Sequence, residues 1–108
     1  MASTLPAGEL FALDTLVTPT AQGIASRVLA RTAAGNITLF AFDAGEELSE
    51  HTAPFDALVL VIDGEAEVEI AGKAFRVSSG ETITLPADIP HAVRAATRFK
   101  MMLTMLRA

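Results

Sequence analysis

The chain has 108 residues, a net charge of −5 and no cysteine, and 51% of its residues are hydrophobic. This length suits a single domain with one modest core. No apolar run approaches the ~20 residues of a membrane helix, and no leader pattern begins the chain, so we expect a cytoplasmic protein without membrane contact. The acidic balance disfavours nucleic acid, because Lys and Arg bind its phosphates. The absence of cysteine excludes disulfides and thiolate chemistry.

Short apolar runs separated by turn residues succeed one another along the chain, which is typical of an all-β sandwich or barrel. Residues 1–20 are predicted to form an N-terminal extension with one short helical turn within residues 7–17, and residues 21–108 a single barrel. The predicted strands are residues 24–33, 37–42, 57–62, 65–70, 74–77, 82–85, 91–96 and 99–106. The acidic stretch 46–50 is predicted to be a solvated turn.

Turn residues and side-chain alternation define several of these strands. Gly35-Asn36 indicates a hairpin before the strand 37–42, and Asp63-Gly64 a tight turn before 65–70. Within 65–70 glutamates alternate with apolar residues, which predicts one wet and one buried face. Residues 57–62 are almost all apolar, so this strand is predicted to be buried on both faces. Pro86 should end the strand 82–85, because proline cannot donate to a ladder.

Glycine, histidine and proline also recur at particular spacings in two stretches: Gly45, His51 and Gly64 in the first, and Gly80, Pro86 and His91 in the second. These stretches resemble the paired motifs of the cupin family, and the likeness covers about residues 36–106. The resemblance implies a cupin (RmlC-like) double-stranded β-helix, or jelly-roll barrel, of the small single-domain conserved-barrel (cupin 2) type.

The metal-ligand set that the resemblance implies is incomplete. In metal-binding cupins two histidines and a glutamate of the first motif and a histidine of the second hold a transition metal. In this chain only His51 and His91 match, because Ala53 and Ala57 occupy the positions of the second histidine and the glutamate. Catalytic metal sites generally take three protein ligands. The cofactor is therefore left open between none and a divalent transition metal held by His51 and His91.

The chain has two histidines, and both fall at motif positions, so we expect His51 and His91 to share a ligand pocket in the barrel mouth. Asp56 is a candidate third pocket residue, if a bulge at Pro54 turns it inward. The predicted partner is a small molecule. The alternatives are a degenerate metal-dependent oxygenase or isomerase, a metal-free epimerase-like enzyme with either histidine as general base, and a structural domain. No catalytic residue is assigned.

Other residue groups allow two interpretations each. The methionines at 101, 102 and 105 are either a soft pocket wall or ordinary filling of a core or dimer face. The arginines at 27, 31, 94 and 98 either grip a carboxylate or pair with the abundant glutamates at the surface. We also expect a homodimer, with residues 24–33 or 99–106 as the apolar edge strand that pairs.

Overall fold

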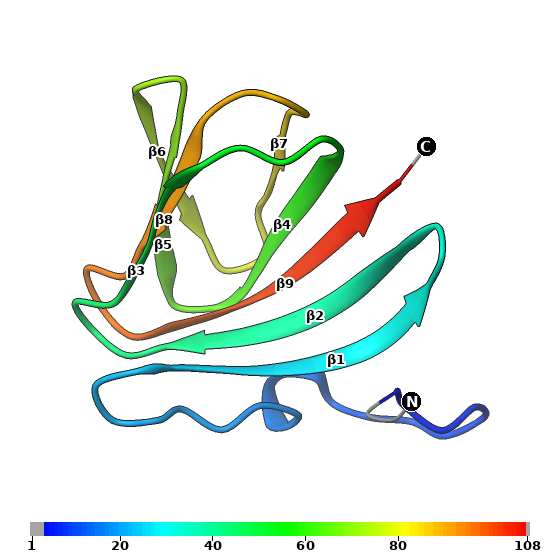
Figure 1. The fold of residues 1–108 in the computed structure, drawn as a ribbon. Helices are drawn as coiled ribbons and strands as arrows, with labels where there is room; N and C mark the ends of the chain where they lie inside the picture. Colours follow the sequence, from blue (N-terminus) through cyan, green and yellow to red (C-terminus); the bar gives the residue numbers. More distant parts are fainter. Residues whose placement is uncertain (1–3, 108) are drawn as a thin grey trace.

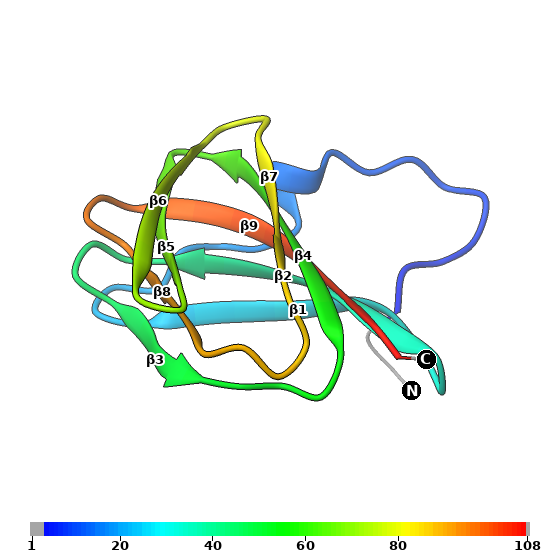
Figure 2. The same cartoon turned by 90° about the horizontal axis from the view of Figure 1, so that it is seen from above.

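The computed structural model describes residues 4–107, and strands make up almost all of their regular structure (Figure 1). The elements are η1 (Leu13–Thr15), β1 (Ile24–Thr32), β2 (Gly35–Phe42), β3 (Glu47–His51), β4 (Asp56–Asp63), β5 (Glu65–Ile70), β6 (Lys73–Ser78), β7 (Thr82–Leu85), β8 (His91–Arg94) and β9 (Phe99–Leu106). A five-stranded sheet has the order β1-β2-β9-β4-β7, and a four-stranded sheet has the order β3-β8-β5-β6. The two sheets enclose the core as a jelly-roll barrel (Figure 2), which confirms the predicted all-β class. Within residues 4–107, no helix is long and apolar enough to cross a bilayer.

The core lies between the two sheets, where alternate residues of each strand meet. Phe42 and Phe99 stack at its centre with ring centroids 4.5 Å apart. The alternation predicted for 65–70 is confirmed, because Ala66 and Val68 of β5 are buried whereas Glu67 is exposed. β5 therefore turns one apolar face to the barrel interior and one polar face to solvent.

Two glycines fix turns of the barrel. Gly64 has φ +78°, and a Cβ atom there would lie 2.6 Å from the Arg98 carbonyl oxygen, so only glycine fits the tight turn between β4 and β5. The predicted hairpin between the first two strands exists, but its turn is at Ala33 and Ala34. Gly35 instead begins β2, where a Cβ atom would collide with the backbone of Met105 on the adjacent strand. Pro86 follows β7 directly, as predicted.

Two strand predictions are corrected. The stretch 46–50 is predicted to be a solvated turn, but most of it belongs to β3 (Glu47–His51), an edge strand that pairs with β8. Residues 57–62 were predicted to be buried on both faces, but Leu58 on the outer side of β4 is 37% exposed. The second sheet covers only the inner side of β4, so Leu58 lies at the surface, whereas Ile62 on the same outer side packs against the cluster around Leu29 and Leu39.

The N-terminal segment packs on the outer side of the five-stranded sheet. Leu5, Leu13 and Leu16 contact a small cluster that contains Leu29 of β1 and Leu39 of β2. The helical turn expected within 7–17 is present as η1. The boundary at residue 20 stays a prediction, and residues 1–3 lie outside the described part of the chain.

The strand order also bears on the predicted dimer. β9 lies between β2 and β4, so residues 99–106 are not an edge strand as proposed from the sequence. β1 does lie at an edge of its sheet. The homodimer itself stays a prediction.

Candidate functional site

The two histidines meet at one end of the four-stranded sheet. His51 is the last residue of β3 and His91 the first of β8, and the two are direct cross-strand partners. Their Nε2 atoms lie 3.2 Å apart, and the rings meet edge to face with centroids 4.4 Å apart. Residues 40 positions apart in the sequence are therefore brought side by side. That they bind a ligand together stays a prediction.

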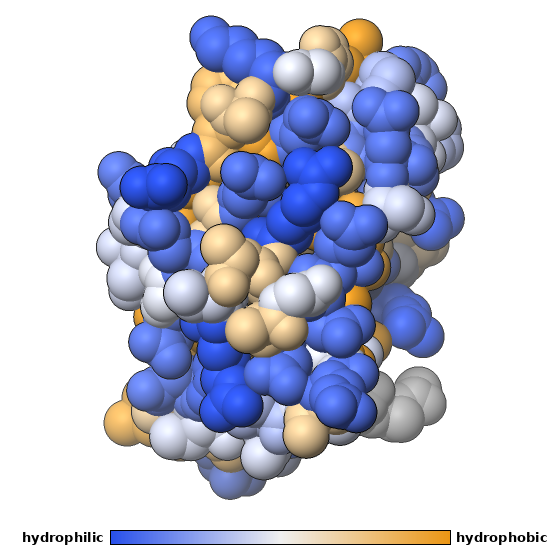
Figure 3. Space-filling view, turned by 90° about the vertical axis from the view of Figure 1, so that its left-hand side faces the viewer, coloured by the Kyte–Doolittle hydropathy of each residue, from blue (hydrophilic) through white to orange (hydrophobic). Residues whose placement is uncertain are grey.

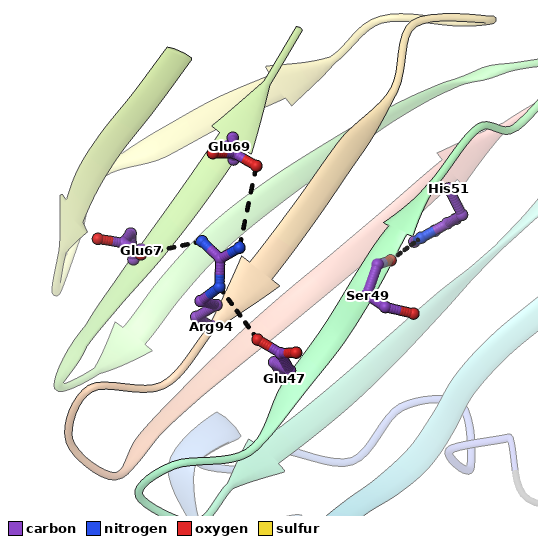
Figure 4. Close-up of polar contacts among 6 residues, drawn as sticks. All are labelled: Glu47, Ser49, His51, Glu67, Glu69 and Arg94. Carbon is purple, nitrogen blue, oxygen red and sulfur yellow. Dashed lines mark hydrogen bonds and ion pairs between the residues drawn. The ribbon is translucent and has the colours of Figure 1, made fainter. Parts of the chain in front are cut away.

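An ion-pair cluster fixes the other end of the same strand pair. Arg94 of β8 contacts Glu47 of β3 at 3.0 Å and Glu67 of β5 at 3.2 Å, and Glu69 lies 3.9 Å away. Figure 4 shows this cluster at one end of β3 and His51 at the other. Surface pairing with glutamates, one of the two interpretations of the arginines, is confirmed for Arg94. The whole outward surface on this side of the molecule is mainly hydrophilic (Figure 3).

Backbone carbonyl groups set the tautomer of both imidazoles. The Nδ1 atom of His51 lies 2.8 Å from the Ser49 carbonyl oxygen, and that of His91 lies 3.2 Å from the Ile89 carbonyl oxygen. A carbonyl oxygen only accepts hydrogen bonds, so each Nδ1 must carry the hydrogen and donate it. A neutral imidazole has one ring hydrogen, so in two neutral rings both Nε2 atoms are bare acceptors, 3.2 Å apart.

The two histidines differ in burial. His91 is 5% exposed, whereas His51 lies at the surface. Burial lowers the pKa of His91 below the usual 6.5, and the nearby His51 lowers it further. A low pKa keeps the His91 ring neutral near pH 7, with its Nε2 lone pair free.

A cavity of about 60 Å³ opens beside the histidine pair in the barrel mouth. Besides the two histidines, the described residues that line it are apolar: Leu48, Ala53, Phe55, Ala57, Leu85, Val93, Met101, Leu103 and Met105. The imidazoles are thus the polar groups of an otherwise apolar pocket, an arrangement typical of sites for small organic molecules.

The third predicted pocket residue, Asp56, lies elsewhere. It is exposed, and its Oδ1 atom accepts a 2.8 Å hydrogen bond from the Ala87 N–H. Ala57, its neighbour on β4, is buried and lines the pocket instead. Since adjacent strand residues point to opposite faces, Asp56 points away from the histidines. The inward turn that the sequence analysis considered does not occur.

The residues present fit a transition metal in spacing but not in number. Two Zn–N bonds of about 2.0–2.1 Å at a tetrahedral angle would hold the nitrogens about 3.3 Å apart, close to the separation of the two Nε2 atoms. Within residues 4–107, however, no group of three or more His, Cys, Asp or Glu side chains could hold a metal ion. The donor set is therefore one protein ligand short of a usual catalytic metal site.

Most of the apolar residues that line the pocket were not predicted from the sequence. Met101 and Met105 alternate on the inner side of β9 and reach the pocket, while Met102 between them packs on the outer side near Leu39. The period-2 spacing of 101, 103 and 105 was available as a signal. Which face looks inward depends on the pairing of β9 with β2 and β4, and that pairing is long-range.

Comparisons with known proteins agree with this architecture. The family model described as "Cupin domain" matches residues 38–106. A conserved protein of unknown function from Streptococcus pyogenes has a solved structure with a TM-score of 0.91 and 33% identity, covering 100% of this chain and 96% of that one. A cupin 2 conserved barrel domain protein from Leptotrichia buccalis has a TM-score of 0.87 and 41% identity, covering 90% of this chain and 47% of that one.

A third relative is known from its sequence. A protein named polyketide synthase CurC, from Streptomyces cyaneus, is 31% identical over 83 residues, which are 76% of this chain and 49% of that protein. The chain thus spans about half the length of this curated relative. The family match covers most of the barrel strands, from β2 to β9. The chain belongs to the cupin domain family and has the RmlC-like double-stranded β-helix fold.

Proposed function

We propose that this chain is a small-molecule-binding cupin whose ligand enters the barrel mouth beside His51 and His91. The observation that supports it most is the mixed chemistry of the cavity. An otherwise apolar pocket receives two imidazole nitrogens, one from a buried and one from an exposed side chain. Apolar walls with a few convergent polar groups are the usual composition of a ligand site.

The size of the cavity limits how the ligand binds. At about 60 Å³ it is far smaller than the roughly 300–1,000 Å³ of sites for drug-sized molecules. The ligand therefore places a small group inside, and its remainder lies across the rim near Phe55 and the exposed His51. Met101 and Met105 allow some enlargement, because unbranched thioether side chains change rotamer easily.

A fragment screen by NMR tests this proposal. The ε-methyl signals of Met101 and Met105 report on the pocket, and that of Met102 on the same strand is the matched control, because its side chain lies on the outer side of the sheet. We expect ligands to shift the first two signals and the histidine ring signals, and to leave the Met102 signal in place. A broad library that shifts none of the pocket signals would contradict the proposal.

A metal-free enzyme is the second candidate, and the free Nε2 of a neutral, buried His91 is the observation that favours it. The relative named as a polyketide synthase suggests a class of substrate, since carbon chains with alternating carbonyl groups have acidic C–H bonds that an imidazole base can attack. Deuterium exchange into 2,4-pentanedione tests it. Exchange faster with the wild-type chain than with the His91→Gln variant supports base chemistry, and equal rates contradict it.

A further inference from the structure

The two histidines lack a hydrogen-bond donor for their Nε2 atoms. Both Nδ1 atoms lie against backbone carbonyl oxygens, so in two neutral rings both Nε2 atoms are acceptors, and they lie 3.2 Å apart. While both rings are neutral, neither Nε2 carries a hydrogen that it could donate to the other. Leaving such acceptors unpaired is costly when one of them is buried. The pair is therefore incomplete until a group with a polar hydrogen or a positive charge joins it.

From this geometry we infer that the pocket selects small apolar molecules that carry a hydroxyl group, phenols above all, and binds the hydroxyl as a donor to the two Nε2 atoms. The inference rests on the proposed function and adds the chemical class of the ligand. A hydroxyl hydrogen that is shared between the two nitrogens in a three-centre hydrogen bond reaches both acceptors without bringing a net charge into the pocket.

The apolar lining excludes the other common ligand classes. Among the described residues that line the cavity, none is Lys, Arg, Asp or Glu, so a carboxylate or phosphate would find no fixed cation inside. Arg107 lies near the rim with its guanidinium carbon 5.4 Å from the Phe55 ring centroid, but it does not line the cavity. A sugar would leave most of its hydroxyl groups unpaired against leucine, valine and methionine side chains.

The lining also suits an aromatic ring behind the hydroxyl. Phe55 lies at the rim, and Met101 and Met105 lie along one wall. Thioether sulfur makes favourable contacts with aromatic rings, and phenylalanine packs on them edge to face or offset. A phenol can thus place its oxygen at the histidine pair and its ring against Phe55 at the rim, and a change of rotamer at Met101 and Met105 would enlarge the cavity of about 60 Å³ to admit the ring further.

Binding of phenol, toluene and benzoate tests the inference, measured on the full chain by shifts of the Met101 and Met105 methyl signals in buffer with a chelator. Toluene has the shape of phenol without its donor, and benzoate carries a negative charge. We expect phenol to bind at least about tenfold more tightly than toluene, the difference made by one satisfied hydrogen bond, and benzoate to bind more weakly than phenol. The His51→Ala variant should lose the preference for phenol over toluene, and the Glu50→Ala variant, altered at an exposed neighbour on β3, should retain it.

Each other result overturns the inference in a distinguishable way. Equal binding of phenol and toluene would show a ligand pocket without hydroxyl selection, which leaves the proposed function standing. Tighter binding of benzoate would show that the pair carries a positive charge, and binding of phenol only after zinc is added would show a metal between the histidines. Failure of all three probes to shift the pocket signals would overturn the inference, and a silent fragment screen as well would overturn the proposed function. A backbone amide spectrum of each variant shows that it is folded.

Discussion

The two strands that carry the histidines differ in how firmly they hold them. β8 lies between β3 and β5, and its first three residues are buried. β3 is an edge strand with an irregular register, and only Leu48 among its side chains is partly covered. His91 is thus fixed by the barrel, whereas His51 is held by one neighbouring strand and one backbone carbonyl. The pocket therefore has one rigid wall, formed by β8, and one adjustable wall, formed by β3.

A carboxylate placed on β8 should lower the stability of the fold far more than one placed on β3, and this is the largest effect we expect. Val93 of β8 is 2% exposed, so Val93→Asp buries a carboxylate without a partner and should cost about 4 kcal/mol or more, a large part of the stability of a small domain. Ser49→Asp places the same side chain at an exposed position of β3 and should change stability little. Urea denaturation measures both, and similar losses in the two variants would contradict the distinction between the strands.

Restoring the missing side chains should create a metal site, because the scaffold still brings the four positions together. Ala53 and Ala57 line the same cavity as His51 and His91. The double variant Ala53→His, Ala57→Glu should bind one zinc ion per chain, and more tightly than the wild-type chain, because three or four protein ligands replace two.

Elemental analysis after dialysis, with isothermal titration, measures this gain. The control adds His51→Ala to the double variant and should weaken binding again. If the wild-type chain already binds zinc as tightly as the double variant, then other groups complete its site, and the account of an incomplete donor set is wrong.

Acid should weaken the fold through the rigid wall. The pKa of His91 is lowered from the usual 6.5 in the folded chain. Below about pH 6.5 this histidine therefore takes up a proton in the unfolded chain but stays unprotonated in the folded one. The free energy of unfolding should therefore fall as the pH drops below about 6.5 and level off below the lowered pKa, by about 1.4 kcal/mol for each unit of lowering. Urea denaturation between about pH 8 and about pH 5 measures the slope, and the His91→Gln variant should show a shallower one. An equal slope in both chains would assign the effect to other groups.

The smallest effect should come from the ion pairs that join β3 to β8 and β5. Arg94 and its glutamate partners are largely exposed, and such pairs contribute little because water screens them. Arg94→Ala should lower the melting temperature slightly, and the difference from the wild-type chain should shrink at high salt. A large, salt-independent loss would show that Arg94 supports β8 through packing instead.

Strands with a clear alternation of polar and apolar residues could be predicted from the sequence, whereas β3, the adjustable wall of the pocket, could not. Charged and apolar residues alternate strictly over residues 65–70, and the turn glycines Gly64 and Gly72 flank this segment, so the local sequence alone defines β5. β3 has a single apolar residue, Leu48, among exposed polar ones, because an edge strand at the barrel mouth buries little. Its identity as a strand depends on pairing with β8, 40 or more residues away, which no local pattern reveals.

The candidate site shows the same division. Motif spacing correctly predicted that His51 and His91 lie together, because both fall in positions of a known scaffold. Their tautomers depend on carbonyl groups at Ser49 and Ile89, and the direction of Asp56 depends on the register of β4. These features arise from backbone geometry, which a list of residue types does not contain.

The protonation of the two imidazole rings decides whether His51 and His91 present two bare Nε2 atoms to one pocket. A long-range proton–nitrogen correlation spectrum of the imidazole rings at about pH 8, assigned with the His51→Ala variant, distinguishes the tautomers. The account predicts that both rings carry their hydrogen on Nδ1 and none on Nε2. A hydrogen on the Nε2 of either ring would contradict it, because one histidine would then donate to the other and no acceptor would be left for a hydroxyl ligand.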